Sequence, residues 1–314
     1  YQRRVRAKLT LSADILRSPV SYIEGSEQHA KVARIPLPAQ GCTCVDCDSI
    51  PPNVFQPRDA YQTLLAVRDL KQFKTQPMYK DASREAIAKA EEIMNLVARC
   101  HNSLRLRESS FFLLCASMHR FLQRVDPFEP EMFKLLCALV FLVHKYEPTD
   151  GQVYRCDAMI ERLFGKQTTV TVQQVLDYEE AVFELLDYSL AAVTPYDFVH
   201  LFADCAQLSP QQACLALYLC SLAVVSPACQ SSDPCRTAAA IVLLVLQKAG
   251  QGWNPSLLFW SGLRPAQFEA KRRQVLQLWT DSFVGMQNGM QSFVVTKFKD
   301  ARKYQVSLEE PVAE

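Results

Sequence analysis

Apolar residues recur at three- and four-residue steps along most of the chain, a spacing that places them on one face of an α-helix. The first such run extends from Asp59 to Phe73 and stops before Pro77. We expect ten further helices, near residues 83–100, 107–124, 129–146, 154–164 and 171–187, and then 195–206, 209–225, 234–249, 254–262 and 265–285. The pattern therefore predicts an all-α fold with two successive five-helix units.

Residues at the expected helix ends support this division. Ser209 and Asp233 each precede a proline, an arrangement in which the side chain caps the first turn and the proline takes the first helical position. Gly250 follows the third helix of the second set, where glycine commonly ends a helix. Only nine glycines occur in 314 residues, which disfavours a β-rich chain with many tight turns.

The pattern also predicts domain boundaries. Residues 1–57 are interrupted by prolines and a polar stretch, so we expect an irregular arm there. An N-terminal helix and linker follow at 58–82, a first helical domain at 83–192 and a second at 193–289. Residues 290–314 complete the chain as a C-terminal helix and tail.

Composition narrows the classes of partner and compartment. The formal net charge is +1, which gives no general electrostatic reason to expect nucleic acid or an anionic membrane as a partner. The longest apolar run, residues 213–225, is shorter than the roughly 20 residues that a membrane span needs. No secretory signal is visible, and most of the twelve cysteines lie in apolar helical stretches, as expected in a reducing compartment. We expect the nucleus or the cytoplasm.

Catalytic and metal-binding motifs are poorly represented in the sequence. It contains no glycine-rich phosphate loop, no His-Glu-x-x-His and no Gly-x-Ser-x-Gly, so we expect neither catalysis nor a cofactor. Cys42, Cys44 and Cys47 could contribute to a zinc site, but no fourth ligand is evident beside them. We therefore expect an ordinary loop there and no bound metal.

Two charged residues occur on apolar helices. Lys145 ends the helix that contains Leu142, a place where the helix dipole alone would explain a lysine. Glu179 lies one turn before Phe183 on the same stripe of its helix, so its carboxylate adjoins apolar surface. A charge in that position favours a binding partner.

Together the two segments resemble the cyclin box. Cyclins end their third helix with Ser-Lys-Tyr/Phe-Glu and carry Met-Glu…Leu…Leu-x-Phe-x-Leu-Ala-Ala-Pro-Thr across their fifth, and residues 142–147 and 175–194 are similar to these two patterns. Residues 118–122 resemble the family's x-Asp-Arg-Phe-Leu, and residues 298–308 are similar to the lysine-rich close of A/B-type cyclins. The resemblance covers about residues 58 to 310 and favours the two-box, mitotic type.

The resemblance implies tandem five-helix cyclin boxes and a regulatory subunit, not an enzyme. It implies binding and activation of a cyclin-dependent Ser/Thr protein kinase, in a heterodimer that acts in cell-cycle control. In cyclins the residues matching Lys145 and Glu179 hold the kinase's loop and regulatory helix, and those matching Tyr146, Phe183 and Tyr188 pack on that helix. The candidate kinase-binding residues are Leu142, Lys145, Tyr146, Glu147, Glu179, Phe183 and Tyr188.

The family's docking groove for Arg-x-Leu peptides is altered here. Counting back without gaps from Arg120 places Lys89, Ile93 and Leu96 at the groove positions, with Leu96 where cyclins have a Trp. The family's Arg and Asp, which pair with one another, are replaced by Ala90 and His119. We therefore expect a weak groove, while a register that matches Arg84 to the family's Arg would need an insertion.

Two other functions are compatible with the sequence. Tandem cyclin folds also occur in nucleic-acid-bound transcription factors, but the near-neutral charge and the retained Lys145 and Glu179 count against that function. A scaffold that keeps only the fold is a further alternative. The segment from Arg6 to Leu9 matches the minimal Arg-x-x-Leu of mitotic destruction signals, a pattern so short that chance matches are common.

Overall fold

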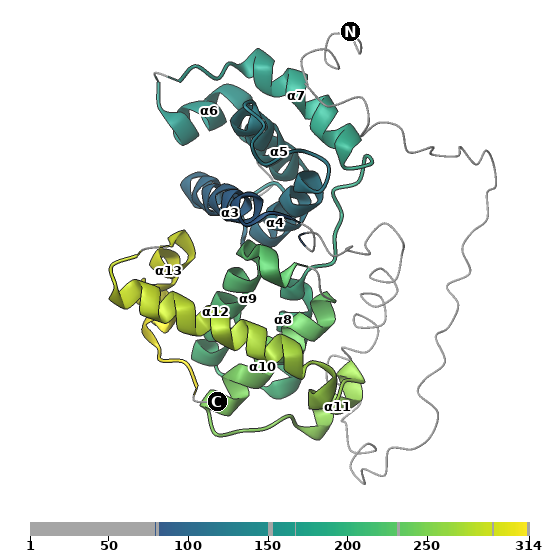
Figure 1. The fold of residues 1–314 in the computed structure, drawn as a ribbon, viewed down its shortest axis with the longest axis vertical. Coiled ribbons are helices and arrows are strands. Elements are labelled where there is room, and N and C mark those ends of the chain that lie inside the picture. Colours follow the sequence, from purple (N-terminus) through teal and green to yellow (C-terminus); the bar gives the residue numbers. More distant parts are fainter. Residues whose placement is uncertain are drawn as a thin grey trace, which may run out of the picture. The chain divides into compact units, whose positions relative to one another are not determined.

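The computed structural model describes Tyr79 and residues 82–149, 153–166, 168–230, 233–290 and 292–312 (Figure 1). The chain divides into two units, Tyr1–Gln56 and Pro57–Glu314, and all described residues belong to the second.

Several predicted features lie outside the described residues. They are the irregular arm, the helix between residues 59 and 73, the three clustered cysteines and the Arg-x-x-Leu segment. Within the described ranges the secondary structure is entirely helical, with eleven α-helices and no strand, and the predicted all-α class is confirmed.

The first five helices form one group around a central helix. They are α3 (Arg84–Leu104), α4 (Glu108–Leu122), α5 (Met132–Tyr146), α6 (Cys156–Phe164) and α7 (Val172–Leu185). Helix α5 contacts all four others, which explains why it is apolar on every side and buried over most of its length. Its C-terminal turn and α7 together make the surface described below.

The next five helices repeat this plan. They are α8 (Pro195–Ala206), α9 (Pro210–Val225), α10 (Pro234–Lys248), α11 (Pro255–Ser261) and α12 (Glu269–Gln287). Helix α10 packs against α8, α9 and α12 and is buried from Thr237 to Leu246. Helix α9 contacts α3 and α4 of the first group as well as its own neighbours, so its apolar residues join the two groups.

The C-terminal segment returns to the first group of helices. Helix α13 (Phe293–Phe298) packs against α3 and α9, and two 3₁₀ turns follow it, Ala301–Lys303 and Val306–Leu308. Lys297 and Lys303 of this segment donate to the carboxylate of Glu108 at the start of α4, over 2.6 and 3.3 Å. Charged contacts therefore tie the end of the chain to the first group.

The expected helix-end chemistry is present. Ser209 Oγ accepts from the Gln212 N–H, and the Asp233 carboxylate accepts from the Cys235 N–H. Gly250 has a φ of +70° just after α10, in the left-handed region that glycine tolerates. Helix α3 continues to Leu104 instead of ending near residue 100 because His101 and Leu104 are themselves buried.

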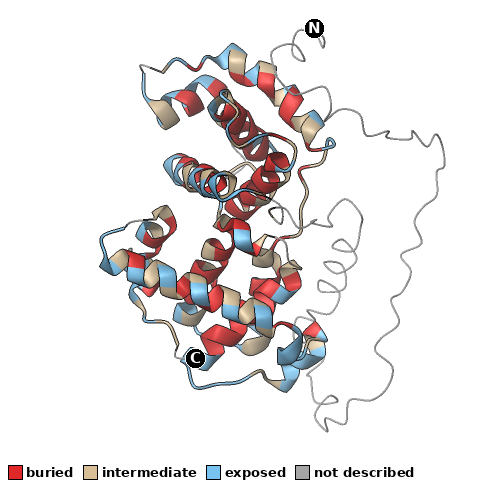
Figure 2. Cartoon of the chain, in the orientation of Figure 1, coloured by how far each residue is buried: buried red, intermediate tan, exposed pale blue. Residues whose placement is uncertain are grey.

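Burial follows the helical stripes, with buried residues facing the interior of each group (Figure 2). The nine cysteines in the described part of the chain are all free, and all but Cys205 are buried, as small apolar residues would be. No helix there combines the length and the apolar character that a membrane crossing requires.

Candidate partner-binding surface

Lys145 and Glu179 lie on neighbouring helices and form an ion pair with one another. The Lys145 Nζ donates to Glu179 Oε1, which joins the C-terminal turn of α5 to the middle of α7. The two side chains are 39% and 18% exposed. Lys145 Nζ also lies 4.8 Å from the centre of the Phe141 ring. The pair is therefore half-buried and remains reachable from outside.

Exposed aromatic residues flank this pair. Tyr146 is 55% exposed and Tyr188 is 62% exposed. Phe183 is half-buried and meets the Tyr188 ring edge-on, with the ring centres 5.4 Å apart. Such amphipathic aromatic side chains are enriched where proteins bind one another.

Leu176 of α7 is an exposed apolar residue beside these side chains in the sequence, and the cyclin-like pattern did not identify it as a candidate. Its position in the sequence could have revealed it, because Leu176, Glu179 and Phe183 follow the three- and four-residue spacing of one helical stripe. We call the set Lys145, Tyr146, Leu176, Glu179, Phe183 and Tyr188 the α5–α7 face.

Two of the candidate kinase-binding residues, Leu142 and Glu147, do not belong to the α5–α7 face. The Leu142 side chain is only 7% exposed, so it belongs to the core beneath the face and not to its surface. Helix α5 is apolar on all sides, and its sequence alone does not distinguish core from surface. The Glu147 carboxylate accepts from the hydroxyls of Ser109 and Ser110, each over 3.0 Å, and so holds the end of α5 to the start of α4.

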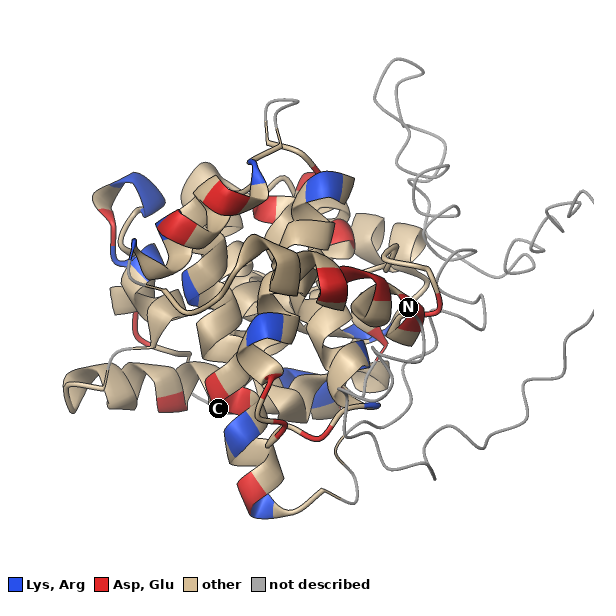
Figure 3. Ribbon diagram, turned by 90° about the horizontal axis from the view of Figure 1, so that it is seen from above, with Lys and Arg blue, Asp and Glu red and all other residues tan. Residues whose placement is uncertain are grey.

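The surface of the helices carries charges of both signs. Viewed from above, basic and acidic residues are interspersed over the helices (Figure 3). No group of three or more His, Cys, Asp or Glu residues among the described positions is arranged to hold a metal ion.

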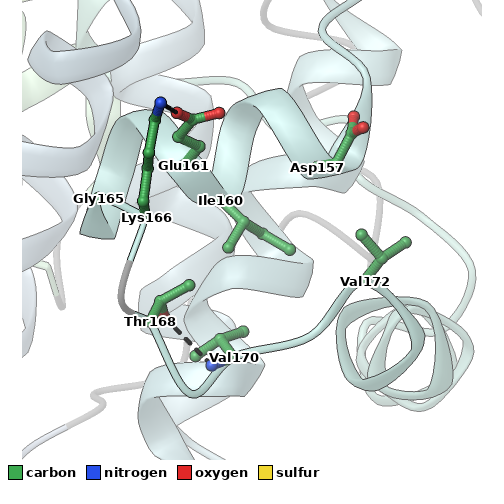
Figure 4. Close-up of a pocket in the computed structure, with 8 residues that line it drawn as sticks. All are labelled: Asp157, Ile160, Glu161, Gly165, Lys166, Thr168, Val170 and Val172. Carbon is green, nitrogen blue, oxygen red and sulfur yellow. Dashed lines mark hydrogen bonds and ion pairs between the residues drawn. The ribbon is translucent and has the colours of Figure 1, made fainter.

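A shallow hollow of about 350 Å³ lies between α6, the loop after it and the start of α7 (Figure 4). Its charged rim residues pair with near neighbours, Asp157 with Arg155 over 2.8 Å and Glu161 with Lys166 over 3.7 Å. None of the predicted site residues lines it. We assign it no role in binding.

Comparison with known proteins finds similarity to cyclins. Residues 193–311 match the family model of the cyclin C-terminal domain. The chain is 24% identical over 211 residues to the G2/mitotic-specific cyclin-B2 of Macaca fascicularis, covering 67% of this chain and 50% of that protein. It is 22% identical over 176 residues to the cyclin-B3 of Gallus gallus, covering 54% and 41%. It is 24% identical over 194 residues to the cyclin cdc13 of Schizosaccharomyces pombe, covering 61% and 39%.

The chain is therefore similar to cyclins, over the C-terminal domain by the family model and over a longer stretch by the mitotic relatives. It spans about half the length of the curated relatives that it matches. Its fold resembles the X-ray structure of a viral cyclin from herpesvirus saimiri, with a TM-score of 0.58 and 15% identity over 71% of this chain and 96% of the other. The predicted resemblance to mitotic-type cyclins is confirmed.

At the positions of the cyclin docking groove the structure shows an ordinary helix surface. Lys89 pairs with Glu92 over 2.9 Å, Ile93 is buried and Leu96 is half-buried. The assignment of a peptide-binding role to these positions stays a prediction.

His119, where cyclins have an Asp, has a structural role. Its Nε2–H donates to the Val224 carbonyl over 2.9 Å, which leaves Nδ1 to accept from the Tyr79 hydroxyl over 3.1 Å. Burial lowers the pKa of His119 to about 4 and raises that of Tyr79 to about 12, so both groups are neutral near pH 7. A neutral link between α4 and the end of α9 thus stands where cyclins have a charged pair involving the first helix.

We expect Arg-x-Leu peptides to bind this chain at least about tenfold more weakly than they bind a typical A-type cyclin, a difference of roughly 1.4 kcal/mol. Leu96 offers less contact surface than Trp, and Lys89 repels the arginine of the peptide. Fluorescence polarisation with one labelled peptide measures this, and Lys89→Met should recover part of the affinity. Equal affinity for this chain and the A-type control would overturn the expectation.

Proposed function

We propose that this chain is a regulatory subunit that binds and activates a cyclin-dependent, or similar, Ser/Thr protein kinase in cell-cycle control. The observation that carries the proposal is the α5–α7 face, where a half-buried ion pair is flanked by exposed tyrosines. The kinase and this chain would form a heterodimer in the nucleus or the cytoplasm.

The Lys145–Glu179 pair keeps capacity for further hydrogen bonds. A lysine ammonium has three donors and a carboxylate has about four acceptor sites, of which their mutual contact uses one each. Lys145 can therefore donate to a kinase carbonyl while Glu179 accepts from a kinase N–H. Because the two charges are already paired, binding does not bury a lone charge.

The aromatic residues supply the apolar part of the interface. Tyr146 and Tyr188 present large side chains of limited flexibility, and Leu176 and Phe183 extend this surface along α7. A helix with its own apolar stripe is the partner that such a surface fits. The regulatory helix of a protein kinase, which moves between two positions, meets that description.

Activation would follow from where that helix is held. In protein kinases a Lys–Glu ion pair and a metal-binding Asp must both be in place before phosphoryl transfer. A partner that binds the regulatory helix in its inward position completes the ion pair. On this proposal the chain contributes no catalytic group and the kinase performs the chemistry.

We expect one or more purified cyclin-dependent kinases to gain phosphoryl-transfer activity when the full chain is added, while the chain alone transfers no phosphate. The measurement is peptide phosphorylation by a panel of such kinases, each with and without the chain. An A-type cyclin serves as the positive control. If no kinase of a responsive panel gains activity, the proposal fails.

A further inference from the structure

Two arginines of α4 bind the C-terminal end of α7. The last carbonyls of a helix have no partner inside the helix and need one from elsewhere. Arg120 donates from Nη1 to the Ser189 carbonyl and from Nη2 to the Leu186 carbonyl, each over 2.9 Å. It thereby holds the chain on both sides of the turn that follows α7.

Arg124 lies one helical turn further along α4 and binds the same turn. It donates from Nη1 to the Leu185 carbonyl and from Nη2 to the Asp187 carboxylate, the latter over 2.5 Å. The positive charges also suit the negative end of the α7 dipole. We call Arg120 and Arg124 together the arginine clamp.

The turn held by the clamp has an unfavourable backbone conformation. Asp187 and Tyr188 both have a φ of +55°, in the left-handed region that non-glycine residues seldom adopt and that is least suited to a bulky side chain. The Tyr188 N–H donates to the Phe183 carbonyl over 2.9 Å, and the Ser189 N–H donates to the Leu186 carbonyl over 3.1 Å. Consecutive residues in this region need outside support to stay there.

This conformation determines where Tyr188 lies. It brings the tyrosine ring back alongside Phe183, edge to face, while most of the side chain stays exposed. An extended conformation at residues 187 and 188 would carry the ring away from α7. The position of one of the exposed aromatic residues of the α5–α7 face therefore depends on two arginines that lie behind it.

We infer that Arg120 and Arg124 are positioning residues for kinase binding, which they support by holding Tyr188 beside Phe183 without touching the partner. The inference rests on the proposed function, since Tyr188 is taken to contact the kinase. Arg124 is the better residue to test because its contact with Asp187 is exposed, whereas both contacts of Arg120 are half-buried, so that loss of Arg120 could disturb folding.

The first test needs no kinase. In Arg124→Ala, the amide hydrogens of Tyr188 and Ser189 should exchange with solvent at least about tenfold faster than in wild type, because their hydrogen bonds open more often. Arg302→Ala is the matched control, since it breaks an exposed Arg–Asp pair in the C-terminal segment. Unchanged exchange at Tyr188 and Ser189 in Arg124→Ala would contradict the inference that Arg124 holds this turn in place.

The second test is a double-mutant cycle on kinase affinity, measured by calorimetry. Arg124→Ala and Tyr188→Ala should each weaken binding about tenfold, and the double variant should bind no more weakly than Tyr188→Ala alone. Independent losses that multiply to about a hundredfold would mean that Arg124 acts without Tyr188, against the inference. Faster exchange in a chain whose wild type binds no kinase would instead overturn the proposed function and leave the clamp in place.

Discussion

Replacing Lys145 or Glu179 with alanine is expected to weaken kinase binding at least about 30-fold, which corresponds to roughly 2 kcal/mol. Each substitution leaves the other charge half-buried and unpaired under the partner, which costs more than the loss of one contact. Lys145 is 39% exposed and solvent screens this single pair, so the free energy of unfolding should change by less than about 1 kcal/mol.

Calorimetry gives the affinity, and circular dichroism with urea unfolding gives the stability. A matched control is Lys166→Ala, which breaks a Lys–Glu pair on α6 and its following loop. That variant should bind as wild type does. A Lys145→Ala, Glu179→Ala double variant that binds with undiminished affinity would exclude this face as the kinase site.

The second large effect concerns folding. We expect Glu108→Ala to lower the free energy of unfolding by about 2 kcal/mol, a value reduced from that of a fully buried pair because these groups are partly exposed. Lys297 is 17% exposed, and it and Lys303 both donate to this one carboxylate. Lys297 also lies 5.4 Å from the Phe111 ring centre, so the contact fixes the C-terminal segment on α4.

Glu108→Gln separates charge from shape, since it keeps an acceptor oxygen and removes the negative charge. Urea unfolding of both variants beside Glu161→Ala, an exposed position, measures the effect. A loss for Glu108→Ala within about 0.5 kcal/mol of this control would show that the two lysines do not need the carboxylate.

We also expect the contribution of the Glu108 carboxylate to the free energy of unfolding to depend on pH. Burial opposes ionisation of Glu108, but Lys297 and Lys303 outweigh it and hold the pKa below its usual value of 4.5. A group with a lowered folded-state pKa stabilises the fold fully above the unfolded-state pKa and loses that contribution as pH falls through the folded-state value. The stability difference between wild type and Glu108→Gln should therefore be full above about pH 4.5 and shrink in more acidic solution.

The helices could be predicted because each buries one stripe of its surface, and that stripe is visible in the sequence. Helix α8 runs over Pro195–Ala206, the range expected from the sequence, and Ser209 caps α9 as its position before a proline suggests. Helix α12 begins at Glu269 instead of residue 265 because Pro265–Gln267 forms a separate 3₁₀ turn. Propensity gives little warning of such a break.

The candidate site could be predicted only in part. The sequence indicated that Glu179 needed a partner, but not that Lys145 would be that partner within the free chain. Arg120 stands in the segment that resembles a cyclin motif, but the sequence did not show what it or Arg124 binds, because their acceptors are mostly main-chain carbonyls of a distant segment that any residue could supply. The contact of Lys297 with Glu108 could not be predicted for a similar reason. The two residues are 189 positions apart, and only folding brings the C-terminal segment to the start of α4.

The most direct test of the central claim is capture from the native cell with the full chain as bait, read by quantitative mass spectrometry. Wild type is compared with the Lys145→Ala, Glu179→Ala double variant, after both are shown to be folded. We predict that a cyclin-dependent or similar kinase is enriched with wild type and lost with the double variant. Equal enrichment by both baits, or no kinase with wild type, would contradict the account.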